Sequence, residues 1–249
     1  MENKWRGFDC EKFQFEEHDA IIVYPKENTK NGYLAVKCEY WDAFPEAAEI
    51  PMLELGFHLC FIKNENRFAM DYDLDRKARF IKYVANKCGL SEKCVPVGMS
   101  CGGLITIKFA AKYPELISCI YIDAPVVNYM SWPIGAGKVR NNFSHEVLET
   151  WKNEAIGALG VSTIGEVLAY RDMPLDNLQK LIANKIPAVM VSGDSDKTVP
   201  FDENGIFVQK AYKDAGLDME VYIKPGGDHH PHGLPDPKPV IDFILKYCN

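Results

Sequence analysis

The 249-residue sequence lacks several features that mark whole classes of protein. It has no Cys-x-x-Cys pair, so neither a zinc ribbon nor a thioredoxin-like redox site is expected. No apolar run approaches the length that crosses a bilayer, and the charged start, MENKWRGFDCEKF, has no signal-peptide stretch. No run of Lys and Arg offsets the net charge of -7. We therefore expect a cytoplasmic protein with no nucleic-acid or membrane partner.

The remaining proportions are those of an ordinary globular chain. The sequence is 47% hydrophobic, 12% aromatic and 25% charged, and its composition does not shift midway, so we expect one domain over residues 1–249. Eight cysteines are scattered through apparent strands and helices of a chain large enough to need no cross-links. We therefore expect the thiols to be mostly buried. The sequence does not indicate an oligomeric state.

Short runs rich in β-branched and aromatic residues recur along the chain, each bounded by turn residues. The first three are joined by short polar turns such as Lys30-Asn31-Gly32, so we expect antiparallel pairing at one sheet edge. Helical stretches at 73–87 and 103–113 separate later runs, which predicts an α/β fold with a mostly parallel sheet covered on both faces. The eight predicted strands are 13–15, 20–24, 33–38, 57–62, 94–97, 118–122, 188–191 and 220–224.

The segment 126–186 departs from this alternation. Roughly sixty residues separate two strands that one short helix would join, which is long for a connection in a compact domain. Its stretches 151–159 and 175–183 have helical character, with glycines between them. We expect a small helical cap inserted after the sixth strand, over the sheet edge where ligands bind. An ordinary pair of packing helices is the alternative.

The motif that indicates chemistry is Gly98-Met99-Ser100-Cys101-Gly102, which matches Gly-x-Ser-x-Gly between a predicted strand and a predicted helix. A sharp turn there lifts the serine hydroxyl above the sheet, and it needs small residues two positions before and after the serine. The N-terminus of the following helix favours negative charge, so we expect the Cys101 N–H to be one oxyanion donor. By itself the motif also fits a glycine-rich turn with a solvent-facing serine.

A serine hydroxyl is a poor nucleophile at neutral pH, so a histidine must lie within hydrogen-bond reach. Two aspartates, Asp194 and Asp196, follow the penultimate predicted strand and offer the carboxylate that orients such a histidine. Three of the six histidines follow the last predicted strand, so serine, aspartate and histidine come after three different strands in that order. The clustered histidines are His229, His230 and His232, and those expected to be structural are His18, His58 and His145.

A metal site is the main alternative for the histidine cluster. His229, His230, His232 and Asp228 offer nitrogen and oxygen ligands. Adjacent residues rarely converge on one ion, however, and Pro231 stiffens the backbone between them. We therefore expect no metal site and no cofactor.

These residues make the chain resemble the α/β-hydrolase fold superfamily over nearly its whole length. Ser100 falls on the family's nucleophile turn, Asp196 on its Gly-x-x-Asp-x-x-Val-Pro acid loop, and His229 on the Gly-x-His segment before the final helix. The resemblance implies that these three residues form the triad, although spacing alone leaves Asp194 open as the acid. Three longer stretches look like a bacterial group of uncharacterised serine esterases: GMSCGGLITIKFAAKYPE, DAPVVNYMSWP and KPGGDHHPHGLPDP.

The resemblance also implies acyl transfer without a cofactor, in which Ser100 forms an acyl-enzyme and water releases the acid. Family members usually take a second oxyanion donor from the loop after the third strand, often within a His-Gly motif. Here that loop reads Lys37-Cys38-Glu39-Tyr40-Trp41 and departs from the motif. The Tyr40 N–H is our prediction for this donor.

The predicted substrate is a small carboxylic ester. We expect Trp132, Tyr129, Glu39 and Trp41 to bind it, although a buried aromatic that stabilises the cap is an equally good interpretation of Trp132. An aminopeptidase or acyl-peptide hydrolase of the same fold is one alternative. It would need an exposed acidic residue for the substrate amine, for which Glu39 and Asp123 are candidates. A non-catalytic ligand-binding protein of this fold is the other, but its usual mark, a broken triad, is absent.

Overall fold

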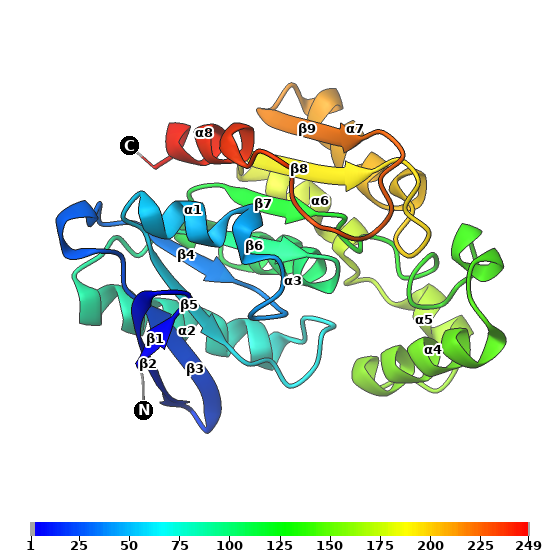
Figure 1. Cartoon of the computed structure of the whole chain (residues 1–249). Coiled ribbons are helices and arrows are strands. Elements are labelled where there is room, and N and C mark those ends of the chain that lie inside the picture. The colour runs from blue at the N-terminus through cyan, green and yellow to red at the C-terminus, as the bar shows by residue number, and fades with distance from the viewer. Residues whose placement is uncertain (1–2, 249) are drawn as a thin grey trace.

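One twisted sheet organises the computed structural model, which describes residues 3–248 (Figure 1). Its nine strands lie in the order β1-β2-β3-β5-β4-β6-β7-β8-β9. All eight predicted strands are present, and the two-residue β1 adds a ninth. The strands are β1 (Lys4–Trp5), β2 (Phe8–Phe15), β3 (His18–Val23), β4 (Leu34–Lys37), β5 (His58–Ile62), β6 (Cys94–Met99), β7 (Ile120–Asp123), β8 (Ala188–Gly193) and β9 (Met219–Lys224).

Strand direction divides the sheet into two parts. The six strands from β4 to β9 run parallel to one another, whereas β1, β2 and β3 form an antiparallel edge that meets β5. The prediction that the third predicted strand joins this edge is wrong. That strand, β4, lies between β5 and β6 and pairs parallel with both, and all four of its residues are buried. A strand covered on both faces belongs in the sheet interior, so burial rather than the preceding turn decides its position.

Helices cover both faces of the sheet, as predicted (Figure 1). One hydrophobic cluster joins α1 and α8 to the sheet, and the other joins α2, α3, α6 and α7 to its opposite face. The central helix α3 is buried along almost its whole length, which explains why its sequence is apolar all round. The α-helices are α1 (Glu49–Glu54), α2 (Asp71–Cys88), α3 (Cys101–Lys112), α4 (His145–Leu159), α5 (Ile164–Ala169), α6 (Pro174–Ala183), α7 (Gly205–Ala215) and α8 (Lys238–Lys246). Short 3-10 helices span Glu27–Thr29, Pro45–Ala47, Pro114–Leu116, Lys138–Asn141 and Phe201–Glu203.

The segment 126–186 contains three α-helices that fall into two groups. Helix α6 packs against α3 and α7 in the layer that covers the sheet. Helices α4 and α5 instead lie beyond the carboxyl ends of the parallel strands (Figure 1). Ligands of parallel α/β sheets bind at those ends, so α4 and α5 are well placed to cover a site. That they act as a cap stays a prediction.

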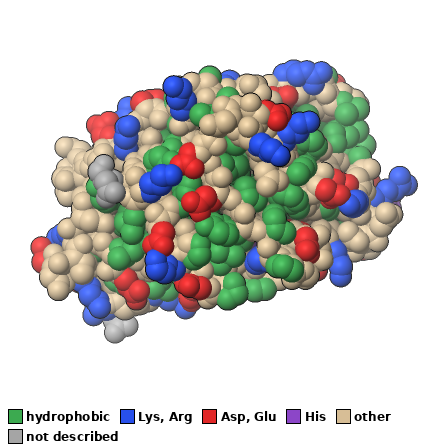
Figure 2. All heavy atoms as spheres, turned by 90° about the horizontal axis from the view of Figure 1, so that it is seen from above, with side chains coloured by type: hydrophobic (Ala, Val, Ile, Leu, Met, Phe, Trp, Pro, Cys, Tyr) green, Lys and Arg blue, Asp and Glu red, His purple; other side chains and the backbone are tan. Residues whose placement is uncertain are grey.

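The surface and the thiols follow the composition. Among residues 3–248, no helix combines the length and the apolar character needed to span a membrane. On the face that is uppermost in Figure 1, Lys, Arg, Asp and Glu side chains of both signs alternate with hydrophobic ones (Figure 2). All eight cysteines are free, and all except the half-buried Cys88 are buried.

Candidate active site

Ser100 lies on the sharp turn between β6 and α3. Its backbone has φ 55° and ψ -117°, a conformation that costs a non-glycine residue on the order of 1–3 kcal/mol. The Ser100 N–H donates to the Asp123 carbonyl at 2.9 Å, and its own carbonyl accepts from Val126 at 3.1 Å, so β7 and the chain after it hold the turn. A Cβ on Gly98 would lie 2.1 Å from the carbonyl oxygen of Gly102. Only glycine lets strand and helix approach this closely.

His229 and Asp196 complete a chain of hydrogen bonds that starts at Ser100. Nε2 of His229 lies 3.1 Å from Ser100 Oγ, and Nδ1 lies 2.7 Å from Asp196 Oδ2. The His229 and Asp196 side chains are almost fully buried. The other carboxylate oxygen of Asp196 accepts backbone N–H bonds from Thr198 at 2.8 Å and Val199 at 2.7 Å, which fixes its orientation. The structure thus brings together the three side chains assigned to one site from the sequence.

The neighbouring carboxylates have other partners. Asp194 accepts the Gly226 N–H at 2.8 Å and the Ser195 hydroxyl at 2.9 Å, so it ties the loop after β8 to the turn after β9. Asp228 accepts the backbone N–H groups of Lys197 at 2.9 Å and His229 at 2.8 Å. Within the described part of the chain, Asp196 is therefore the carboxylate that contacts the His229 ring.

Two backbone N–H groups are candidates for the oxyanion hole. Cys101 is the first residue of α3, where N–H groups have no carbonyl partner within the helix. Tyr40 lines the same cavity as Ser100, but its N–H lies 3.4 Å from Oε1 of Glu39, a weak contact that an oxyanion would have to replace. Burial raises the pKa of the Cys101 thiol to about 11, so this thiol stays protonated and does not compete with the serine.

Ser100 opens into a cavity of about 340 Å³ with mainly aromatic walls. Trp132 is stacked on Phe68 at a centroid distance of 6.0 Å, and Trp151 of α4 lies 5.9 Å from Trp132. Trp132 is therefore both a buried aromatic and a wall of the cavity. Such walls suit an apolar group on a small ligand. The lining residues are Tyr40, Ala43, Phe44, Arg67, Met99, Ser100, Trp132, Trp151, Thr198, His229, His230 and His232.

Tyr129 and Glu39, both predicted to bind substrate, do not line this cavity. Tyr129 is fully buried, and its hydroxyl donates to the Phe68 carbonyl at 3.3 Å. Glu39 accepts an N–H bond from the Asn64 side chain at 2.7 Å. Each side chain is occupied by a structural contact.

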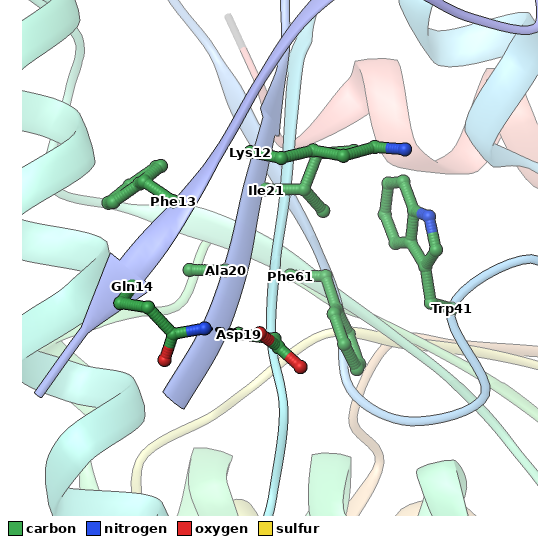
Figure 3. Close-up of a pocket in the computed structure, with 8 residues that line it drawn as sticks. All are labelled: Lys12, Phe13, Gln14, Asp19, Ala20, Ile21, Trp41 and Phe61. Atoms are coloured by element: carbon green, nitrogen blue, oxygen red, sulfur yellow. Dashed lines mark hydrogen bonds between the residues drawn. The ribbon is translucent and has the colours of Figure 1, made fainter. Parts of the chain in front are cut away.

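Trp41, the third such residue, faces a different cavity of about 380 Å³ at the antiparallel edge of the sheet. Its ring lies 4.9 Å from Trp5 and 5.6 Å from Phe61. Trp41 and Phe61 lie on the opposite side of the strands from Phe13 (Figure 3). The other residues of this cavity are Lys12, Gln14, Asp19, Ala20 and Ile21. Tyr40 and Trp41 are consecutive in the sequence, yet their side chains line different cavities.

A second histidine-aspartate pair, which sequence reasoning missed, lies beside the first. Nδ1 of His232 lies 2.7 Å from Asp123 Oδ1, while Asp123 Oδ2 accepts the Gly233 N–H at 2.7 Å and the Tyr121 hydroxyl at 2.9 Å. Burial alone would raise the pKa of Asp123, but the bonds from His232 and Gly233 outweigh it and hold that pKa below its ordinary value. Asp123 is thus a buried carboxylate and not the exposed acid that would receive a substrate amine.

The three histidines of the cluster gather at one wall of the cavity. Their ring centroids lie 4.8 Å apart for His229 and His230, and 4.9 Å apart for His232 and each of the others. Pro231, between His230 and His232, does not prevent the three rings from lying side by side. His230 is stacked on Phe44, and its partial burial beside the other two rings lowers its pKa, which favours the neutral imidazole.

Sequence comparison covers the hydrogen-bonded serine, histidine and aspartate of this site. The profile of the prolyl oligopeptidase family matches residues 75–247, which include Ser100, Asp196 and His229. The chain belongs to the prolyl oligopeptidase family. The resemblance to the α/β-hydrolase fold superfamily predicted from the sequence is therefore confirmed. A search of curated proteins found no match.

Two solved peptidase structures share the fold of this prolyl oligopeptidase family member. A putative dipeptidyl aminopeptidase IV from Bacteroides ovatus matches with a TM-score of 0.65 and 15% identity, over 97% of this chain and 35% of that one. The acylaminoacyl peptidase of Pyrococcus horikoshii matches with a TM-score of 0.66 and 17% identity, over 90% of this chain and 38% of that one. The chain thus spans little more than a third of either structure. These matches confirm the α/β-hydrolase fold, whereas the resemblance to an esterase group stays a prediction.

Arg67 is a cavity residue that no sequence motif indicated. Its guanidinium lies 4.9 Å from the centre of the Trp132 ring, and it donates to the Tyr40 hydroxyl at 3.3 Å and to Glu154 of α4 at 2.8 Å. Burial opposes its charge, but the bonds to Glu154 and Tyr40 and the nearby Cys101 together outweigh this effect and raise the pKa of Arg67. In this prolyl oligopeptidase family member, a fixed cation therefore joins the cavity wall to α4.

Proposed function

We propose that the chain hydrolyses an acyl bond through an acyl-enzyme on Ser100, with His229 as general base and Asp196 as its orienting carboxylate. The observation that carries this proposal is the unbroken set of contacts from Ser100 through His229 to Asp196 at the wall of a cavity. Membership of the prolyl oligopeptidase family supports the same chemistry. The intact set also argues against a ligand-binding protein that has lost its triad.

Each chemical step uses an atom whose position is known. His229 Nε2, 3.1 Å from Ser100 Oγ, takes the hydroxyl proton as the oxygen attacks the carbonyl carbon. The charge that develops on the carbonyl oxygen is stabilised at the N-terminus of α3 by the Cys101 N–H. The imidazolium then gives its proton to the leaving nitrogen or oxygen, and the bond from that atom to the carbonyl carbon breaks. Water deprotonated by His229 attacks the acyl-enzyme and releases the acid and Ser100.

For the substrate, we propose a peptide whose acyl part is apolar and has no free amine. Among the described residues that line the cavity there is no Asp or Glu. Arg67 supplies a positive charge, which repels an ammonium group, and the nearby Glu154 carboxylate is engaged by Arg67. An N-blocked acyl group therefore suits this cavity better than the free amine of an aminopeptidase substrate. One structural neighbour is, by its name, an acylaminoacyl peptidase.

A carboxylic ester, the substrate predicted from the sequence, is the second candidate. The same aromatic cavity of about 340 Å³ favours it, because a small ester also needs no acidic partner. An ester is the easier bond to cleave, since its alkoxide leaving group depends less on a proton from His229 than an amine does. Peptide cleavage is therefore the discriminating measurement.

Three substrates with one acyl side chain separate these candidates: N-acetyl-phenylalanine nitroanilide, phenylalanine nitroanilide and N-acetyl-phenylalanine nitrophenyl ester. We expect kcat/KM for the acetylated anilide to exceed that for the free amine by at least about tenfold, which corresponds to about 1.4 kcal/mol. Turnover of the ester with neither anilide cleaved would favour the esterase. A preference for the free amine would overturn the proposal of an N-blocked substrate. The Ser100→Ala variant is assayed on the same three substrates as a control. Any turnover that it retains comes from a source other than Ser100.

A further inference from the structure

Three histidines face one point of the active-site cavity. One ring nitrogen of each of His229, His230 and His232 lies within 4.8 Å of those of the other two. All three residues line the cavity. Asp196 and Asp123 each lie 2.7 Å from the Nδ1 atom of their histidine, so Nε2 of His229 and of His232 are the atoms available to a ligand.

We propose that these three imidazoles bind a divalent transition-metal ion such as Zn²⁺, and that the bound metal inhibits the active site. Zinc takes imidazole nitrogens readily, and three histidines with one open position is an established coordination. Zn–N bonds of about 2.0–2.1 Å place tetrahedral ligand nitrogens about 3.3 Å apart, so the rings must draw together by roughly 1.5 Å. His230 is exposed, and its ring has no hydrogen-bond partner within residues 3–248, so its ring is free to rotate toward the other two.

The two aspartates prepare the buried histidines for a metal. A metal-bound histidine usually donates its second ring N–H to a carboxylate, which fixes the ring and increases its basicity. Both His229 and His232 already have this arrangement, through Asp196 and Asp123. A proton held on Nδ1 leaves the lone pair on Nε2. Acyl transfer needs only one such pair, so the His232 pair is free for this second role.

Inhibition follows from a shared atom. Nε2 of His229 lies 3.1 Å from Ser100 Oγ and is the atom that accepts its proton. The same lone pair cannot coordinate a metal and accept a proton at once, so a metal-bound chain cannot activate Ser100. The inhibitory step rests on the proposed function, whereas metal binding does not.

Binding is measured first, without substrate. The full chain, freed of metal with a chelator, is titrated with Zn²⁺ in competition with a chromophoric zinc chelator. We expect one Zn²⁺ per chain, with affinity reduced at least about tenfold in His230→Ala and about 10–100-fold in Asp123→Asn, which removes the carboxylate behind His232. His230 is exposed, so its variant should fold, as melting curves verify. Ser100→Ala should bind zinc within a few-fold of the natural chain.

Two controls test the specificity of binding. His18→Ala removes a histidine on β3 that contacts Glu65, and it should leave the affinity unchanged. Mg²⁺ should not compete, because it prefers oxygen ligands. The absence of stoichiometric binding, or an equal loss of affinity in His18→Ala and His230→Ala, would overturn the metal site.

Activity then tests the inhibitory step. Stoichiometric Zn²⁺ should abolish turnover, EDTA should restore it, and His230→Ala should need at least about tenfold more Zn²⁺ for half-inhibition. One bound Zn²⁺ with unchanged turnover would overturn inhibition. A fully active Ser100→Ala would instead overturn the proposed function, while zinc binding by that variant would still support the metal site.

Discussion

His229 and His232 lie with ring centroids 4.9 Å apart, and each is hydrogen-bonded through Nδ1 to its own buried aspartate. Asp196 follows β8, and Asp123 ends the adjacent strand β7. The loop after β9, which carries both histidines, is therefore hydrogen-bonded to carboxylates from the ends of two neighbouring strands. Of the two histidines, His229 also contacts Ser100. Loss of the His229–Asp196 pair should therefore lower turnover, whereas loss of the His232–Asp123 pair should lower stability.

Ser100→Ala should reduce hydrolysis of the best substrate by more than about a thousandfold, because only the attacking oxygen is lost. Covalent labelling by a fluorophosphonate should disappear with it, and the melting temperature should not fall. Ser91→Ala, on a surface turn, is the matched control and should keep both activity and labelling. A labelled and active Ser100→Ala protein would mean that another residue is the nucleophile.

Asp196→Asn should keep the fold but lower turnover by as much as about ten-thousandfold, because an amide can hold His229 in the wrong tautomer. Asp194→Asn is the matched control two residues away. It removes the negative charge from the acceptor of the Gly226 N–H and weakens that bond, so the melting temperature should fall while turnover stays near normal. Turnover and melting temperature are measured for both variants. Large catalytic loss in Asp194→Asn with normal turnover in Asp196→Asn would reverse the assignment.

Asp123→Asn should lower the melting temperature at pH 7, by about 2–8 °C if the lost contacts are worth 1–2 kcal/mol. The pKa of Asp123 in the folded chain is below its ordinary value, so the ionised carboxylate is favoured by folding. Its contribution is complete above the unfolded pKa of about 3.9 and is lost as the pH falls through the lower folded pKa.

The difference in melting temperature between the natural chain and Asp123→Asn should therefore shrink below about pH 4. Asp218→Asn, which removes an exposed ion pair with Lys246, should cost less at every pH. A difference that grows as the pH falls would show that the sign of the Asp123 shift is wrong.

Arg67→Ala should change substrate preference more than stability. Without its guanidinium, Glu154 is left unpaired near the cavity, so the preference for N-acetylated over free-amine anilide should fall by about tenfold. Arg79→Ala is the control, because Arg79 forms a similar pair with Glu16 on the surface. The ratio of the two kcat/KM values is the measurement. An unchanged ratio would exclude Arg67 as the reason that the cavity disfavours an amine.

Local features of the site were predictable because each depends on residues a few positions apart. Gly98 and Gly102 flank Ser100 at the spacing that lets strand and helix touch, and the apolar stretches on either side form β6 and α3. The order serine, aspartate, histidine was also informative, since the carboxyl ends of parallel strands meet at one edge of the sheet. These patterns placed Ser100, Asp196 and His229 near one another without any knowledge of loop paths.

Only the tertiary structure decided the contacts between residues that are distant in the chain. Asp123 and His232 are 109 residues apart, and Arg67 and Glu154 are 87 residues apart. A hydrogen bond requires its atoms within about 3 Å and in the right direction, and no sequence pattern specifies that over such separations. Trp41 likewise lies on another surface than its neighbour Tyr40, because the loop turns at Tyr40, whose backbone is left-handed with φ 54°. The sequence by itself determined the nucleophile turn and the order of the triad, whereas the paths of the loops decided which carboxylate meets which imidazole.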